Sequence, residues 1–187
     1  TYIFNSKDLC IIEHVPELID AGIDSFKIEG RMKTALYVAT VARTYRKAIE
    51  DYLKDPKLYE ANMEWYKEEI GKCTYREFTT GFYFGKPGSD AQIYNSNTYV
   101  KNYTYLGTVE EADGKGRCRI EQKNKFSVGE TIEIMKPDGR NLEVVVKSIC
   151  DEDGNEQESA PHPKQILWVD LGADVDKYDI LRKKEDN

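Results

Sequence analysis

The clearest pattern of apolar and polar positions lies in residues 34–53, where apolar side chains recur every three or four residues. That spacing lines one face of an α-helix, so a long amphipathic helix is predicted there. Residues 55–70 open with an aspartate and a proline, which are typical of a helix cap and first turn, and predict a second helix that ends at Gly71. A short helix is expected from Pro16 to about Gly22. The apolar positions of the long helix are Val38, Val41, Tyr45, Ala48, Ile49 and Tyr52.

Two short segments before the long helix have the composition of β-strands, residues 2–4 and residues 25–29. A strand, a helix and another strand within about thirty residues form a βαβ unit, whose two strands run parallel. The second strand would end in the turn that leads to the long helix. Because α/β folds carry their chemistry at the carboxyl ends of parallel strands, this turn is a candidate active site.

After Pro87 the pattern changes to short strands separated by glycine-containing turns. Their regular spacing predicts a small closed antiparallel barrel of about six strands. The boundary is expected between Gly85 and Lys101, which gives a βα and helical domain at residues 1–86 and a β-barrel domain at residues 87–187. The predicted fold class is therefore α+β. The predicted strands are residues 103–109, 117–122, 131–135, 142–149, 166–169 and 179–182.

Three charged residues, Glu29, Arg31 and Lys33, occupy the turn that follows the second predicted strand. A guanidinium binds a carboxylate or a phosphate through two parallel hydrogen bonds, which suits Arg31 to an acidic substrate. Glu29 can orient Arg31 or act as an acid or base. These three are the candidate catalytic residues, and the alternative is an ordinary solvated turn at the start of a helix.

One predicted barrel strand carries an unusual number of bases. A period of two places Arg117, Arg119, Lys123 and Lys125 on the same side as Glu121. This side is the candidate RNA-binding surface, since lysine and arginine contact phosphates. The alternative is the ordinary outer face of a barrel. Three further bases can extend the surface, namely Lys136, Arg140 and Lys147.

The composition narrows the classes of function. The chain has 187 residues and a net charge of −7, which excludes nucleic-acid binding over the whole surface but leaves room for a local basic patch. No apolar run is long enough to cross a bilayer, so we expect a cytoplasmic protein without a membrane partner. The four cysteines form no CxxC pair, so their spacing indicates neither a zinc ribbon nor a disulfide framework. Free cysteines are typical of a reducing compartment, which we therefore expect. No HExxH motif or nucleophile elbow is present.

Several motifs together resemble the peptidase U32 family. The resemblance rests on residues 5–10 (NSKDLC), residues 16–25 (PELIDAGIDS) and residues 27–33 (KIEGRMK), and residues 78–82 (FTTGF) resemble the segment before the family's C-terminal domain. Long members of the family are similar in plan, with a TIM-like barrel followed by a small β-barrel. The resemblance implies that residues 1–54 are the last βα units of the first domain. We therefore expect the chain to be the C-terminal part of a U32 protein.

The resemblance also implies a cofactor. Several members bind a 4Fe-4S cluster through four cysteines, and the last of these matches Cys10. The other cysteines, Cys73, Cys118 and Cys150, match no ligand position of the family and are expected to be structural thiols. Because a cluster needs four thiolates, none is expected in this chain by itself.

The family leaves two kinds of function open. Some members are collagenase-like peptidases, and others hydroxylate tRNA or rRNA. The resemblance thus implies that the parent protein is an enzyme, that this piece is inactive alone, and that its β-barrel binds either RNA or a protein substrate. A non-catalytic packing module is the third alternative. Residues 1–54 are also expected to expose apolar surface and to favour self-association.

Overall fold

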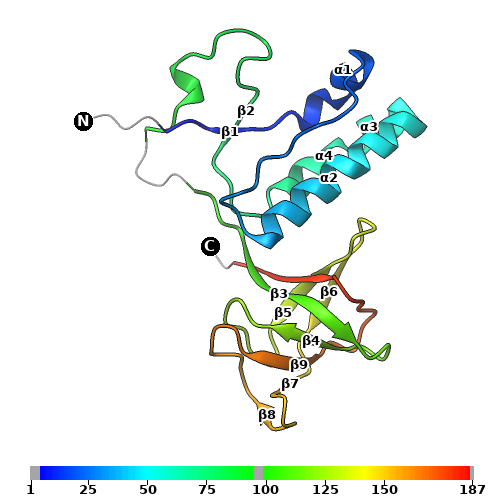
Figure 1. Cartoon of the computed structure of the whole chain (residues 1–187), viewed down its shortest axis with the longest axis vertical. Coiled ribbons are helices and arrows are strands. Elements are labelled where there is room, and N and C mark those ends of the chain that lie inside the picture. Colours follow the sequence, from blue (N-terminus) through cyan, green and yellow to red (C-terminus); the bar gives the residue numbers. More distant parts are fainter. Residues whose placement is uncertain (1–4, 95–98, 186–187) are drawn as a thin grey trace. The chain divides into compact units, whose positions relative to one another are not determined.

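A computed structural model of the chain describes residues 5–94 and 99–185 (Figure 1). The chain divides into two compact units, Thr1–Asn102 and Tyr103–Asn187. The first unit is mainly helical and the second is a β-sheet, which confirms the α+β fold class. No helix among the described residues is long and apolar enough to cross a membrane.

The long helix forms almost where its pattern predicts it. Thr34 caps it by accepting a hydrogen bond from the backbone N–H of Tyr37, and its carboxyl end meets Asp55, which caps the next helix. The predicted second helix is instead two helices, because Asn62 interrupts it and donates its side-chain amide to Asp51. The apolar side of the long helix packs against the other helices around a core that includes Ala48. The helical elements of this unit are η1 (Ile12–His14), α1 (Val15–Asp20), α2 (Ala35–Lys54), α3 (Pro56–Ala61), α4 (Met63–Ile70) and η2 (Ser89–Ala91).

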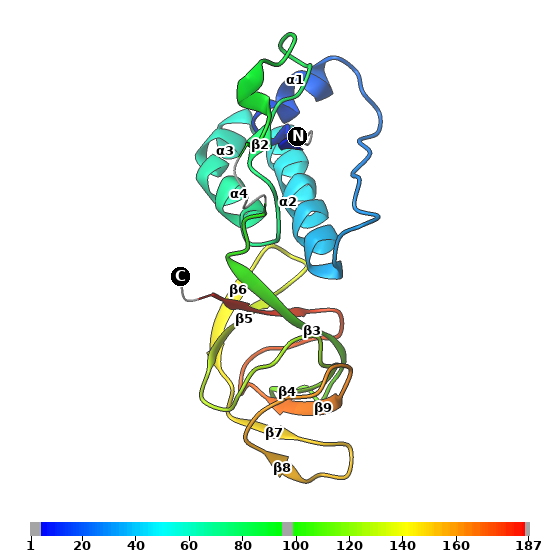
Figure 2. The same cartoon turned by 90° about the vertical axis from the view of Figure 1, so that its left-hand side faces the viewer.

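The predicted strand at residues 25–29 is wrong. Residues 23–30 have no regular structure and form the blue loop between α1 and α2 in Figure 2. A strand needs a neighbour for its backbone hydrogen bonds, and the described residues place no strand beside this segment. The predicted strand at residues 2–4 lies outside the described residues. The parallel pair that does form joins β1 (Asp8–Leu9) to β2 (Phe78–Thr79).

Residues 87–94 lie with the helical unit, although they were predicted to belong to the β-barrel domain at residues 87–187. The backbone N–H of Ile93 donates to the carbonyl of Asn5 at 2.8 Å, and that of Lys7 donates to the carbonyl of Ala91 at 3.1 Å. These bonds tie the segment after β2 to the chain just before β1.

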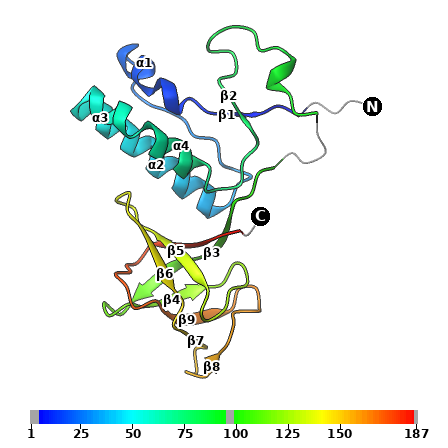
Figure 3. The same ribbon diagram turned by 180° about the vertical axis from the view of Figure 1, so that it is seen from behind.

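The described residues of the second unit form one antiparallel sheet of eight strands in the order β6-β5-β10-β3-β4-β9-β7-β8. The expectation of about six strands was low, because residues 142–149 form two strands and β8 was not predicted. The sheet curls around one core to which β4, β5 and β9 contribute (Figure 3). Register shifts in β3 and β10 add to this curvature. Its strands are β3 (Tyr103–Ala112), β4 (Arg117–Glu121), β5 (Thr131–Met135), β6 (Asn141–Val145), β7 (Ser148–Cys150), β8 (Glu156–Gln157), β9 (Ile166–Asp170) and β10 (Ile180–Lys184).

Candidate functional site

The three candidate catalytic residues lie in the segment just before α2. Glu29 accepts a hydrogen bond from the backbone N–H of Arg31 at 2.8 Å, and both side chains are exposed. Lys33 is half-buried, with its ammonium 3.4 Å from a carboxylate oxygen of Asp8 and 5.0 Å from the centre of the Tyr37 ring. Lys33 is therefore the member of the three that reaches the β1 strand.

Asp8 is the centre of the ionic contacts on β1. It accepts hydrogen bonds from Nε, Nη2 and the backbone N–H of Arg76, at 2.8–2.9 Å. Burial alone would raise the pKa of Asp8, but the bonds from Arg76 and the charge of Lys33 hold it below its ordinary value. The sequence did not identify Asp8 and Arg76 as partners, because nothing local links two residues so far apart along the chain.

Cys10, the candidate cluster ligand, follows β1 and is half-buried. Its Sγ lies 3.7 Å from the hydroxyl of Tyr45, which also accepts the backbone N–H of Ile11 at 2.8 Å. Burial raises the pKa of the Cys10 thiol above its ordinary value. Within residues 5–94 and 99–185, no three His, Cys, Asp or Glu side chains gather in a way that could hold a metal ion. The described donor set therefore does not fit a 4Fe-4S cluster by itself, and Cys10 can supply one thiolate at most.

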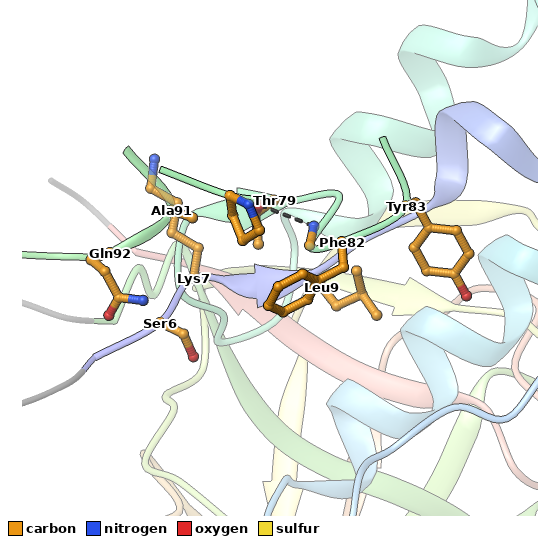
Figure 4. Close-up of a pocket in the computed structure, with 10 residues that line it drawn as sticks. Ser6, Lys7, Leu9, Thr79, Phe82, Tyr83, Ala91 and Gln92 are labelled. Carbon is orange, nitrogen blue, oxygen red and sulfur yellow. Dashed lines mark hydrogen bonds between the residues drawn. The ribbon is translucent and has the colours of Figure 1, made fainter. Parts of the chain in front are cut away.

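A hollow of about 570 Å³ lies beside β1 and β2 (Figure 4). Leu9 and Phe82 line it, and Phe82 is 78% exposed. Among the described residues of the segment 5–54, Leu9, Met32 and Leu53 are all more than half exposed. This observation fits the expected apolar surface, while self-association remains a prediction.

The predicted RNA-binding residues lie at and just beyond β4. Arg117 and Arg119 alternate along the strand, whereas Lys123 and Lys125 follow its end at Glu121. The guanidinium of Arg117 lies over the ring of Trp168, 5.3 Å from its centre. All four side chains lie at least partly at the surface.

Carboxylates partner two of these bases. Arg119 forms ion pairs with Glu110 and Glu152, and Lys123 forms one with Glu121. The sequence pattern showed the row of bases and Glu121 within it, but not Glu110 and Glu152, which lie outside β4. The other bases considered behave differently: Lys136 is buried among aspartates, Arg140 pairs with Asp138 and Asp174, and Lys147 is exposed.

A groove of about 560 Å³ lies on the same side as Arg119 and Lys123. Two tyrosines line it, Tyr105 from β3 and Tyr178 from the loop before β10. Sequence reasoning missed both of them and Trp168. Tyrosines are ordinary residues in and around the strands of a sheet, so only the folded structure shows which of them share a groove with basic side chains.

Comparison with known proteins identifies the class. Residues 1–93 match the model of peptidase family U32, and residues 101–182 match the model of the peptidase family U32 C-terminal domain. The chain therefore belongs to peptidase family U32.

Three curated relatives show the range of this family. The chain is 38% identical over 183 residues to tRNA hydroxylation protein P1 of Bacillus subtilis, covering 97% of the chain and 43% of that protein. It is 33% identical to tRNA hydroxylation protein P of Escherichia coli, covering 98% of the chain and 40% of that protein. A collagenase of Porphyromonas gingivalis is 40% identical over 129 residues, covering 64% of the chain and 31% of that protein. The chain thus spans less than half the length of these relatives.

One solved structure is similar to part of this chain. The crystal structure of the C-terminal domain of a U32 peptidase from Geobacillus thermoleovorans is 32% identical to this chain and has a TM-score of 0.40. The match covers 44% of this chain and 92% of that one.

Proposed function

We propose that this chain is the substrate-engaging part of a tRNA-hydroxylating U32 protein, and that its β unit binds RNA in the cytoplasm. The observation that carries the proposal is the 38% identity to tRNA hydroxylation protein P1 over 97% of the chain. The similarity to a collagenase covers a smaller share, 64% of the chain. Each of these relatives is more than twice as long, so the reaction itself is assigned to the whole protein.

The surface at β4 supports a role in RNA binding. The guanidinium of Arg117 and the indole of Trp168 are planar groups of the kind that contact nucleotides, and they lie against each other. Arg119 lies on the same strand, and Lys125 extends the basic row past its end. The ion pairs of Arg119 and Lys123 limit the number of phosphates this row can neutralise, which suits a moderate affinity in an acidic chain.

The loop with Glu29, Arg31 and Lys33 is proposed to contribute to a reaction site completed by residues outside this chain. The contact of Lys33 with Asp8 supports this proposal. It joins the motif at residues 27–33 to the motif at residues 5–10, which also contains Cys10. In the same proposal, Cys10 supplies one ligand of a 4Fe-4S cluster whose other thiolates lie outside the described residues. This chain alone is expected to be inactive.

The cofactor proposal can be tested on the chain itself. After anaerobic treatment with ferrous iron and sulfide, the chain should hold well below four irons, since one thiolate cannot hold a cluster. Iron and sulfide content should be the same in wild type, Cys10→Ser and the control Cys150→Ser. A content near four irons per chain, lost in Cys10→Ser and kept in Cys150→Ser, would contradict the proposal that the other thiolate ligands lie outside the described residues.

The RNA-binding proposal predicts that Arg117→Gln with Lys125→Gln weakens binding of unmodified tRNA by roughly ten- to thirtyfold near 0.1 M salt, because two phosphate contacts are lost. The slope of log affinity against log salt should fall by about one for each contact. Both quantities are measured by fluorescence anisotropy in a salt series.

The matched control removes two charges from the helical unit, with Lys54→Gln and Lys57→Gln, both of which are exposed. This control changes the net charge of the chain by the same amount as Arg117→Gln with Lys125→Gln does. It should leave the affinity for tRNA nearly unchanged. Equal losses in the two double variants would mean that net charge, rather than the β4 surface, governs binding. Binding of denatured collagen but not of tRNA by the wild type would instead favour a peptide-binding role.

A further inference from the structure

The groove beside Tyr178 has a feature that RNA binding through β4 does not explain. We propose that this groove holds one unstacked base of single-stranded RNA, with the Tyr178 ring as its stacking surface. The inference rests on the proposed RNA-binding function and specifies the part of the RNA that the β unit contacts.

Tyr178 has a backbone conformation that bulky residues rarely adopt. Its φ is +78°, and Lys164 is the other non-glycine residue with positive φ in the described part of the chain. Glycine takes this conformation without strain, so a tyrosine here needs a reason. Packing does not provide one, because Tyr178 is 68% exposed. Backbone strain of this kind is concentrated at functional sites, where the surrounding structure maintains it.

The surrounding loop is firmly held. The ammonium of Lys136 lies 2.8 Å from Asp176 and 3.0 Å from Asp179, the residue after the tyrosine. The backbone N–H of Asp176 donates to the Asp179 carboxylate at 2.8 Å, and that of Tyr178 donates to the carbonyl of Val109 at 2.9 Å. The backbone that carries the ring is therefore already fixed. Binding of a base loses little free energy to ordering of this loop.

The rest of the groove provides polar groups for the edge of a base. Tyr105 and Thr108 share a hydrogen bond of 2.8 Å between their hydroxyls. The ammonium of Lys177 lies 5.1 Å from the centre of the Tyr178 ring. Arg119 and Lys123 line the groove. Their carboxylate partners Glu110 and Glu121 line it as well, so it offers hydrogen-bond donors and acceptors side by side.

This chemistry favours a base over a phosphate or an apolar peptide. Paired charges attract phosphate weakly, whereas stacking on an exposed aromatic ring is how many proteins hold unstacked nucleobases. The volume of about 560 Å³ is within the range of pockets that hold small molecules, roughly 300–1,000 Å³.

The test uses the full chain and a labelled octauridylate, whose bases are weakly stacked on one another. Tyr178→Gly removes the ring and suits the positive φ, so loss of binding will not arise from misfolding. It is expected to weaken octauridylate binding by about five- to 100-fold, the effect of one stacked base. Tyr178→Phe keeps the ring and should stay within about twofold of wild type, for the same reason. Lys164→Gly, which relieves the other positive φ, is the matched backbone control.

A second probe is an eight-residue abasic ribose-phosphate chain, to which wild type and Tyr178→Gly should bind equally weakly. If wild type binds octauridylate and Tyr178→Gly binds it equally well, the inference is overturned and the proposed function stands. If Tyr178→Gly weakens the binding of both probes equally, the ring contacts the ribose-phosphate backbone of the RNA. That result also overturns the inference. If wild type binds neither octauridylate nor tRNA, the proposed function fails, and the inference fails with it.

Discussion

Replacing Lys136 with alanine is expected to lower the free energy of unfolding of the β unit by about 3–5 kcal/mol, the usual cost of removing one partner from a buried ion pair. The Lys136 side chain is 2% exposed and contacts Asp174, Asp176 and Asp179 at 2.8–3.3 Å. Asp179 is itself fully buried, so its carboxylate would lose its cation without gaining water. Burial alone would lower the pKa of Lys136, but hydrogen bonds to Asp176 and Asp179 raise it above its ordinary value.

Urea unfolding followed by Trp168 fluorescence measures the effect, in a Trp65→Phe background that silences the other tryptophan. The control Lys183→Ala removes a half-exposed pair with Glu130 and should cost less than about 1 kcal/mol. Replacing Asp179 as well should recover part of the loss, since the uncompensated carboxylate is then gone. Equal stability of Lys136→Ala and Lys183→Ala would show that burial does not govern these pairs. Because Lys136 anchors the loop of Tyr178, its loss should also weaken octauridylate binding.

Replacing Arg43 with alanine is expected to destabilise the helical unit by about 3 kcal/mol, near the lower end of the range for a broken buried pair. Arg43 on α2 contacts Glu69 on α4, whose side chain is 1% exposed. Lys72 lies 3.5 Å from Glu69 and supplies partial compensation, which places the expected loss at the lower end. The variant also loses the contact of the guanidinium with the Trp65 ring, 5.7 Å from its centre.

The same helix offers a matched control. Arg46 pairs with Glu50 at the surface, where both side chains are more than half exposed. Arg46→Ala should therefore cost no more than about 0.5 kcal/mol. The two variants are compared by urea unfolding with Trp65 as the probe, in a Trp168→Phe background. A loss in Arg46→Ala as large as that in Arg43→Ala would contradict the assignment of a buried, stabilising pair.

The elements that local residue patterns determine were predicted well. The predicted helix at residues 34–53 forms as Ala35–Lys54, because its cap, its apolar spacing and the following Asp55-Pro56 all lie within the segment itself. The strand at residues 131–135 was predicted with the bounds it has, since alternation and glycine turns are also local. The motifs near Cys10 and Lys33 were sufficient to indicate the U32 family, which the family models confirm.

The pairings between distant segments depended on the tertiary structure. Residues 25–29 have the composition of a strand, yet β1 pairs with β2, because a strand forms only where the folded chain supplies a partner. The acidic partners of Arg119 and the burial of Lys136 likewise come from other strands and loops. The exposed ring of Tyr178 became a candidate only when its positive φ and its groove were known. Such features depend on the path of the whole chain, which no pattern confined to neighbouring residues records.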